Sequence, residues 1–522
     1  MQPQSTSTNA ASTSQHVEVE STAKPEPQLL DLLVQYGTGE SRSVAAKPVD
    51  GFLAAESLAE KLKAYLGRLP QPDDYEAVKR RIARDISRID DMLSSQVNSI
   101  LHHPKFQALE SAWRGLWLTV ERAQQGLDTI EEQGGHGGIQ IRVLNVSKKE
   151  LARDFDRAIE FDQSAMFQKV YEEEFGMAGG TPYGALIGNY SFTNHPDDIE
   201  LLGHMSGVAA AAFAPLITDA GPNLLGLDDF STLEQPLNLQ ATFAQKNYVR
   251  WNSLRERDDT QFLALTLPRV LIRKPYTNDG QTTAGFRFTE DVQGPDQSKY
   301  LWGSAAWAFA SVILRAYAAT GWFGDIRGVK RGSAEGGLVT ALPTHSFGTD
   351  REGVAIKSST EVALSDTDER ALCQLGFVPL SDCQDTEYSV FYSNQSVHEP
   401  KEYDDPVASA NARISAMMQY VLCCSRFAHY VKVLARTKLG SSQDPYEIQN
   451  WLNSWLVDYV TADDRANPEM KARFPLREAE CQVDRVPSQP GVFRLTINLR
   501  PHYQLDQLAA SVRLVARVSQ PS

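Results

Sequence analysis

Basic residues are in short supply in this chain of 522 residues: 51 Lys and Arg stand against 66 Asp and Glu, a formal net charge of -15. An acidic surface repels phosphate backbones and anionic lipid headgroups, so the charge argues against a general nucleic-acid or membrane-surface binder. Charged residues make up 22% of the chain and hydrophobic residues 42%, which is typical of a folded globular protein. At about 150 residues per domain, this length accommodates roughly three domains.

Cysteine and long apolar runs are also scarce. The five cysteines are an odd number and all lie late in the chain, so we expect free thiols in a reducing compartment. The first 27 residues lack the apolar run of a secretory signal and predict a disordered tail. Of the most apolar stretches, residues 207–217 are too short to cross a bilayer, and residues 305–319 contain Arg315. We therefore expect a cytoplasmic protein.

Motifs for catalysis or metal binding are missing. His102 and His103 are adjacent, so their side chains diverge on a helix or strand and cannot easily share one ion. Pro400 follows the only His-Glu pair and prevents the helical face of a zinc protease motif. The glycine-rich segments 134–138 and 332–337 lack the Lys-Ser/Thr ending of a phosphate-binding loop. We expect no catalytic residues, no metal and no cofactor.

The hydrophobic pattern predicts an α/β protein. Apolar residues recur every three or four positions from Val78 to Ile100, and a second such stripe starts at Phe106 after Pro104, so two long helices are expected. The alternating residues 139–146 predict a strand, and a helical period over Leu151, Phe155 and Ile159 follows. The predicted organisation is a tail (1–27), an arm and linker (28–70), a helical region (71–138), a layered α/β domain (139–400) and a C-terminal helical and β domain (401–522).

The C-terminal third predicts one long helix from Pro406 to about Leu439, a second helix from Pro445, and then antiparallel strands. In two of these strands apolar residues alternate with polar ones. From Lys471 onward eight Lys and Arg face four Asp and Glu, so this end is basic within an acidic chain. Either the sheet closes within its own domain, or neighbouring subunits share it. The candidate linking residues are Phe493, Arg494, Leu495, Ile497, Leu499, Val512, Arg513, Leu514, Ala516 and Arg517.

A short apolar cluster follows the N-terminal tail. It sits before a Gly- and Ser-containing linker, which suits a tethered helix that docks on a partner, although it could equally pack on the core. The cluster consists of Leu29, Leu30, Leu32, Leu33 and Val34.

From about Tyr75 to its C-terminus the chain resembles the large subunit of the type VI secretion contractile sheath, the TssC (EvpB/VipB) family. The resemblance rests on LHHPKFQALESAWRGLW (101–117), IRVLNVSKKELARDFDRAIEFDQSAMFQKVYEEEFG (141–176), LTLPRVLIRKPY (265–276), SKYLWGSAAWAFA (298–310), SRFAHYVKV (425–433) and RPHYQLDQLAASVRLVA (500–516). It implies a contractile tail-sheath fold that co-assembles with a small subunit, TssB, and with further copies of itself around a tube of Hcp rings. It also implies attachment to a baseplate and recycling by the ATPase ClpV through the N-terminal arm, whose tail and linker depart from the usual family pattern. The family has no catalytic residues to transfer.

Two other classes remain open at this stage: the sheath of a phage tail or phage-like injector, and a cytoplasmic α/β enzyme.

Overall fold

The computed structural model forms two compact units, Met1–Met92 and Leu93–Ser522. The residues that it describes are 52–67, 75–132, 138–235, 237–278, 285–293, 296–329, 335–340, 342–345, 359–383, 386–439, 444–463, 466–486, 492–502 and 512–519. The predicted tail and the apolar cluster of the arm lie outside these residues.

The first unit contains helix α3 (Leu58–Leu66) and the first two thirds of α4 (Tyr75–Leu101), whose last residues belong to the second unit. Ser57 begins α3 with a capping box, because its hydroxyl accepts from the Glu60 amide while the Glu60 carboxylate accepts from the Ser57 amide. Near the other end, the Tyr65 hydroxyl donates to Asp85 of α4.

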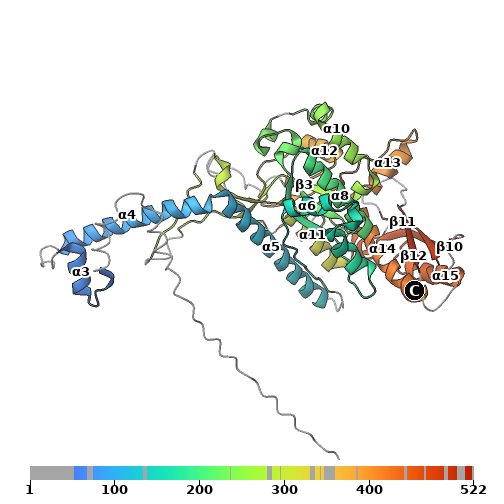
Figure 1. Cartoon of the computed structure of the whole chain (residues 1–522), viewed down its shortest axis with the longest axis horizontal. Helices are drawn as coiled ribbons and strands as arrows, with labels where there is room; N and C mark the ends of the chain where they lie inside the picture. Colours follow the sequence, from blue (N-terminus) through green and yellow to red (C-terminus); the bar gives the residue numbers. More distant parts are fainter. Residues whose placement is uncertain are drawn as a thin grey trace, which may run out of the picture. The chain divides into compact units, whose positions relative to one another are not determined.

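The second unit combines helices with small sheets (Figure 1), four of which lie in its described residues. Its α-helices are α5 (Pro104–Glu132), α6 (Lys148–Arg157), α7 (Ala165–Phe167), α8 (Pro196–Ala212), α9 (Leu239–Phe243), α10 (Val249–Arg255), α11 (Ala305–Thr320), α12 (Asp366–Gln374), α13 (Pro406–Ser415), α14 (Met418–Leu439), α15 (Pro445–Val457) and α16 (Pro468–Arg473). A π-helix, η3 (Gln168–Gly176), follows α7; the short 3-10 helices are η2 (Phe161–Gln163), η4 (Pro222–Leu225), η5 (Phe230–Glu234), η6 (Lys246–Tyr248), η7 (Asp258–Phe262) and η8 (Gln297–Lys299).

A parallel sheet forms the centre of the second unit, in the order β1–β2–β3–β7. Its strands are β1 (Leu186–Phe192), β2 (Leu216–Ala220), β3 (Leu263–Leu267) and β7 (Phe377–Pro379). Two small antiparallel sheets, β4–β5 and β6–β9–β8, consist of β4 (Val270–Arg273), β5 (Leu301–Gly303), β6 (Leu338–Val339), β8 (Ser381–Asp382) and β9 (Ser389–Val390). The C-terminal antiparallel sheet consists of β10 (Leu476–Arg485), β11 (Val492–Pro501) and β12 (Val512–Ser519).

Both faces of the central sheet are covered, which explains its nearly continuous apolar strands. On one face, Leu216 and Leu263 pack in the same cluster as Leu202 of α8. On the other face, the next residues along these strands, Ile217 and Ala264, join the cluster of α11. The layered α/β architecture predicted from the sequence is therefore confirmed.

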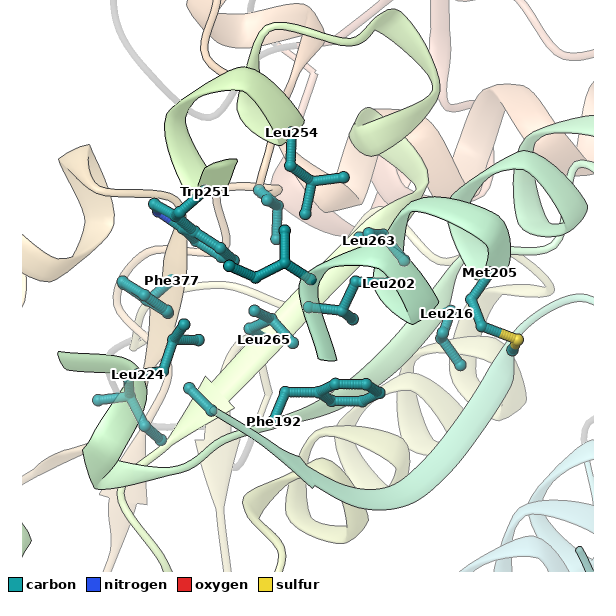
Figure 2. Packing of buried hydrophobic residues seen from close by; sticks show 14 of the residues in the cluster. Phe192, Leu202, Met205, Leu216, Leu224, Trp251, Leu254, Leu263, Leu265 and Phe377 are labelled. Carbon is teal, nitrogen blue, oxygen red and sulfur yellow. The ribbon is translucent and has the colours of Figure 1, made fainter. Parts of the chain in front are cut away.

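The cluster on the α8 side is centred on aromatic rings. Figure 2 shows the indole of Trp251 lying over the ring of Phe377, with the two ring centroids 5.6 Å apart and the planes nearly parallel. Leu202 and Met205 of α8 approach the same cluster from above the strands (Figure 2). Burial of such large side chains is the main term that stabilises this unit.

Several helix starts agree with the prediction. Helix α5 begins at Pro104, and α13 and α15 begin at Pro406 and Pro445. Asp405 and Asp444 cap the latter two helices by accepting from the amides two residues later.

Three predictions of local structure are wrong. Residues 139–146 form no strand, although their sequence alternates. Helix α6 ends at Arg157 because Ala158 is extended, which leaves the Ile159 side chain 90% exposed. The long helix expected from Pro406 is two helices, because α13 ends at Ser415 and the backbone turns before α14 starts at Met418.

Candidate assembly surfaces

The C-terminal sheet holds the candidate linking residues, and β11 is its central strand. Each β11 residue from Val492 to Leu499 has a partner in β12, and all but Val492 have one in β10 as well. Ile497, for example, lies between Cys481 and Leu514. Since both of its edges are paired within the chain, β11 cannot accept a further strand.

The apolar face of β11 belongs to the core of its own chain. Phe493, Leu495, Ile497 and Leu499 are all buried, and they pack in one cluster with side chains of α14 and α15. The partners in that cluster include Phe427, Leu452 and Leu456. On the opposite face Arg494 is exposed and lies in register with Asp484 and Arg517. The alternation therefore predicted which face of β11 is buried. That face packs within its own chain, so these four apolar side chains do not lie on the surface.

One outer edge of this sheet, that of β10, is capped by α15. The Cys481 amide donates to Asn453 Oδ1 at 2.7 Å, and Asn453 Nδ2 donates back to the Cys481 carbonyl at 3.0 Å. Two residues further on, the Val483 amide donates to Gln449 Oε1 at 3.1 Å. These side chains occupy backbone groups that an incoming strand would need.

The other outer edge, that of β12, is open among the described residues. Val512, Arg513, Leu514, Ala516 and Arg517 all lie on β12, whose backbone pairs with β11 from Val512 to Ser519. Within the part of the chain that the structure describes, no hydrogen bond engages the outer edge of this strand. An open row of amides and carbonyls is a template for a neighbour's strand. The sequence offered no way to decide which of the two edges is free.

Helix α5 presents a second candidate surface because it packs in an unusual orientation. Its buried residues are the small Ser111, Gly115, Thr119, Ala123 and Gly126. The large apolar side chains point outward: Trp113 is 66% exposed and Trp117 70% exposed, with Leu109 and Val120 beside them. The predicted apolar stripe is therefore real, but it faces away from the core. A contiguous exposed apolar stripe of this kind marks an interaction site.

The small residues explain this orientation. A Cβ atom on Gly115 would lie 2.3 Å from the indole of Trp307 in α11, and one on Gly126 would lie 3.1 Å from the Ala318 Cβ. Only glycine allows the two helix backbones to approach so closely. The small residues recur at spacings of three and four, and this regular repeat was the sequence signal that could have revealed the buried face.

Buried charges anchor α5 at its start. Arg273 of β4 donates to Glu110 Oε1 at 2.9 Å and to Glu290 Oε2 at 2.6 Å. Although burial opposes ionisation of Glu290, hydrogen bonds from Arg273 and from the Tyr276 amide outweigh it and hold the pKa of this carboxyl below its ordinary value. His102 Nε2 lies 3.4 Å from Glu290 Oε1. This cluster holds the start of α5 in one orientation.

Helix α4 has no buried residue along its 27 positions. Ile86, Ile89 and Met92 of the first unit are all exposed large apolar side chains. A helix receives most of its stability in water from packing, so an unpacked apolar stripe favours contact with another chain.

Asp219 has a raised pKa, and its contacts connect two elements of the fold. Removal from water raises the pKa of Asp219 to about 6, and hydrogen bonds from Ser304 and Thr266 oppose this rise. Asp219 Oδ1 accepts from Thr266 Oγ1 at 2.7 Å and lies 3.4 Å from the Ala306 amide, at the start of α11. Its role in the fold is to join the end of β2 to the start of that helix.

Within the described residues, no three His, Cys, Asp or Glu side chains gather as a metal site would require. Among the described helices, none has the length and hydropathy of a membrane span.

An open strand edge on β12 and outward apolar faces on α4 and α5 are the contact surfaces that a subunit of a helical sheath needs. Comparison with known proteins identifies the same class of protein. The family model of the EvpB/VC_A0108 tail sheath N-terminal domain matches residues 83–398. The model of the EvpB/VC_A0108 tail sheath gpW/gp25-like domain matches residues 407–518, which contain the C-terminal sheet. The chain is a tail sheath protein.

The type VI secretion system sheath protein TssC1 of Pseudomonas aeruginosa (strain PAO1) is 42% identical to this chain over 436 residues. The match covers 83% of this chain and 85% of that protein. The chain belongs to the VipB/EvpB family of type VI secretion sheath subunits, as its resemblance predicted. As a sheath subunit it assembles with other sheath components, and its family is one of structural sheath proteins.

Proposed function

We propose that the chain co-assembles with the small subunit TssB into a contractile sheath around an Hcp tube, in the cytoplasm and on a baseplate. Contraction would propel the tube and its spike for effector delivery, without any catalytic step in this chain. The open edge of β12 supports this most directly, because a strand shared with a neighbour keeps subunits connected while they move.

The apolar faces of α4 and α5 add support. Exposed Trp113 and Trp117 would be costly on a free surface, but they suit a surface that the small subunit covers. We further propose that ClpV recycles the contracted sheath through the N-terminal arm. That arm lies outside the described residues, so the support for ClpV is the family resemblance alone.

Proline substitutions in β12 test the proposed strand sharing. Successive amides of a strand point to opposite edges, so of Leu514 and Val515 one donates toward β11 and the other outward. Leu514→Pro and Val515→Pro, each co-expressed with TssB, should both prevent long sheaths. The inward substitution should also cost ~3 kcal/mol or more of sheet stability, whereas the outward one should leave the pair of this chain with TssB intact.

Electron microscopy and sizing of the co-expressed proteins provide the measurement, and Leu514→Ala and Val515→Ala are the matched controls. Full-length contractile tubes from both proline variants would rule out β12 as the linking strand.

A further inference from the structure

Residues 139–146 have the sequence of a strand but pair with no strand among the described residues. Ile139, Ile141 and Val143 alternate with polar or charged residues at the start of this segment. In the structure the segment runs between α5 and α6 without helix, turn or bend. A conflict between a strong local pattern and the observed structure is expected at functional sites.

Most of the backbone of this segment makes no hydrogen bond with the described residues. Among the described residues, no hydrogen bond reaches an amide or carbonyl of residues 139–145. The first backbone contact is at the end of the segment, where the Tyr190 hydroxyl donates to the Val146 carbonyl at 2.7 Å. Val143 is 67% exposed, and Ile141 and Leu144 are exposed as well. Within the described part of the chain, residues 139–145 therefore present unpaired backbone groups, and three of their apolar side chains are exposed.

The segment is nevertheless held in place. At one end, Ile139 lies against α5, where its Cδ1 is 3.0 Å from the position of a Cβ on Gly126. In the middle, Arg142 pairs with Glu174 and donates to Thr181 Oγ1 at 2.9 Å. At the other end, Ser147 caps α6 in a capping box with Glu150. A segment fixed at three points has little conformational entropy left to lose when it binds.

We propose that residues 139–146 form a β-strand with an extended segment of the small sheath subunit, by main-chain pairing. The proposal rests on the proposed co-assembly. Pairing of this segment with itself across a two-fold axis would close a dimer, whereas a sheath requires contacts that propagate. Strand β12 of a second copy is a poorer match, because each register that places Arg513 or Arg517 opposite Arg142 brings two like charges together. The expected partner segment alternates apolar residues and carries neutral or acidic side chains between them.

Two neighbouring proline variants test the pairing. Val143→Pro and Leu144→Pro each remove one amide, and because these amides point to opposite edges, only one of them faces the partner. One variant should bind the small subunit about tenfold more weakly or worse, while the other stays close to the unaltered chain. Val143→Ala and Leu144→Ala are the matched controls, and both should bind nearly as well as the unaltered chain.

Binding is measured with the full chain by titrating purified small subunit, and thermal unfolding of each variant alone checks its fold. The proposal is overturned if both proline variants bind normally, or if alanine weakens binding as much as proline does. It is also overturned if both proline variants remain folded and lose binding of the small subunit to the same extent. If the unaltered chain itself does not bind the small subunit, the proposed co-assembly fails instead. A cross-link from Val143→Cys to β12 of a second copy would identify the wrong occupant and also overturn the proposal.

Discussion

Glu290 shows at the scale of one residue how the chain orients helix α5. Its carboxylate accepts from both terminal nitrogens of Arg273 and from the Tyr276 amide, at a place that water scarcely reaches. Arg273 also donates to Glu110, which lies on α5 one turn before Trp113 and two turns before Trp117. A buried charge that loses its partner is costly, so these contacts specify one orientation of α5.

The ion pair makes a pH-dependent contribution to stability. The folded-state pKa of Glu290 is lowered, so the stabilisation is present above the unfolded-state pKa of about 4.3 and is lost as the pH falls through the folded value. Glu290→Gln should lower the free energy of unfolding near neutral pH by about 2 kcal/mol, because Arg273 loses a charged partner. The difference between variant and unaltered chain should shrink on acidification, when the native carboxyl is itself protonated.

Urea unfolding at neutral and acidic pH measures this difference. The exposed Asp291→Asn is a neighbouring control, and it should change stability much less. A Glu290→Gln difference that stays constant with pH would contradict the electrostatic explanation.

At the scale of elements, α5 and α11 form a helix pair defined by small residues. Gly115 lies directly under the Trp307 indole, and Ala318 lies against Gly126. The pair buries the small side of α5 because this brings the backbones close and covers the apolar α11. The cost is that the tryptophans of α5 remain on the surface.

Gly115→Ala should therefore separate the two helices. Its Cβ would lie 2.3 Å from Trp307 atoms, so α5 or the indole must shift, at a cost of about 1–3 kcal/mol. Thermal unfolding and hydrogen exchange of α5 measure the effect. Gly138→Ala is the control, since a Cβ there meets nothing within 4 Å and its stability should be unchanged. Equal stability of the two variants would show that the close approach is not required.

At the scale of the whole molecule, the chain carries more unpartnered surface than a free-standing protein needs. Helix α4 buries none of its residues, α5 exposes two tryptophans, and the outer edge of β12 has no partner among the described residues. Each of these features promotes aggregation of an isolated chain, whereas in a lattice it can form a contact with a neighbouring subunit. They agree with the sheath family to which the chain belongs.

The double variant Trp113→Ser and Trp117→Ser tests whether α5 is covered in the assembly. Both side chains are largely exposed, so the isolated chain should keep its stability within about 0.5 kcal/mol. Sheath formation with the small subunit should be lost, because large aromatic residues dominate interface energies.

Co-sedimentation and electron microscopy report sheath formation. Ile159→Ser is the control, since its side chain is 90% exposed but lies outside the α5 stripe. Normal tubes from the tryptophan double variant would show that this face stays uncovered.

Much of this protein followed from local chemistry. Aspartate before proline at Pro406 and Pro445 predicted helix starts, because a carboxylate satisfies the first free amides whatever surrounds it. Interleaved helical and strand patterns predicted a layered α/β domain, and long motifs indicated the sheath family. These features depend on neighbours in the sequence, and so the sequence alone determines them.

Tertiary structure decided the rest. The outward face of α5 depends on whether Gly115 or Trp117 fits α11 better, and the free edge of the C-terminal sheet depends on Asn453 and Gln449 reaching β10. Residues 139–146 likewise form no strand despite their alternation, since strand formation also needs a pairing partner. In each case the outcome is a competition between surfaces far apart in the chain, which periodicity cannot resolve because it describes a face without saying what covers it.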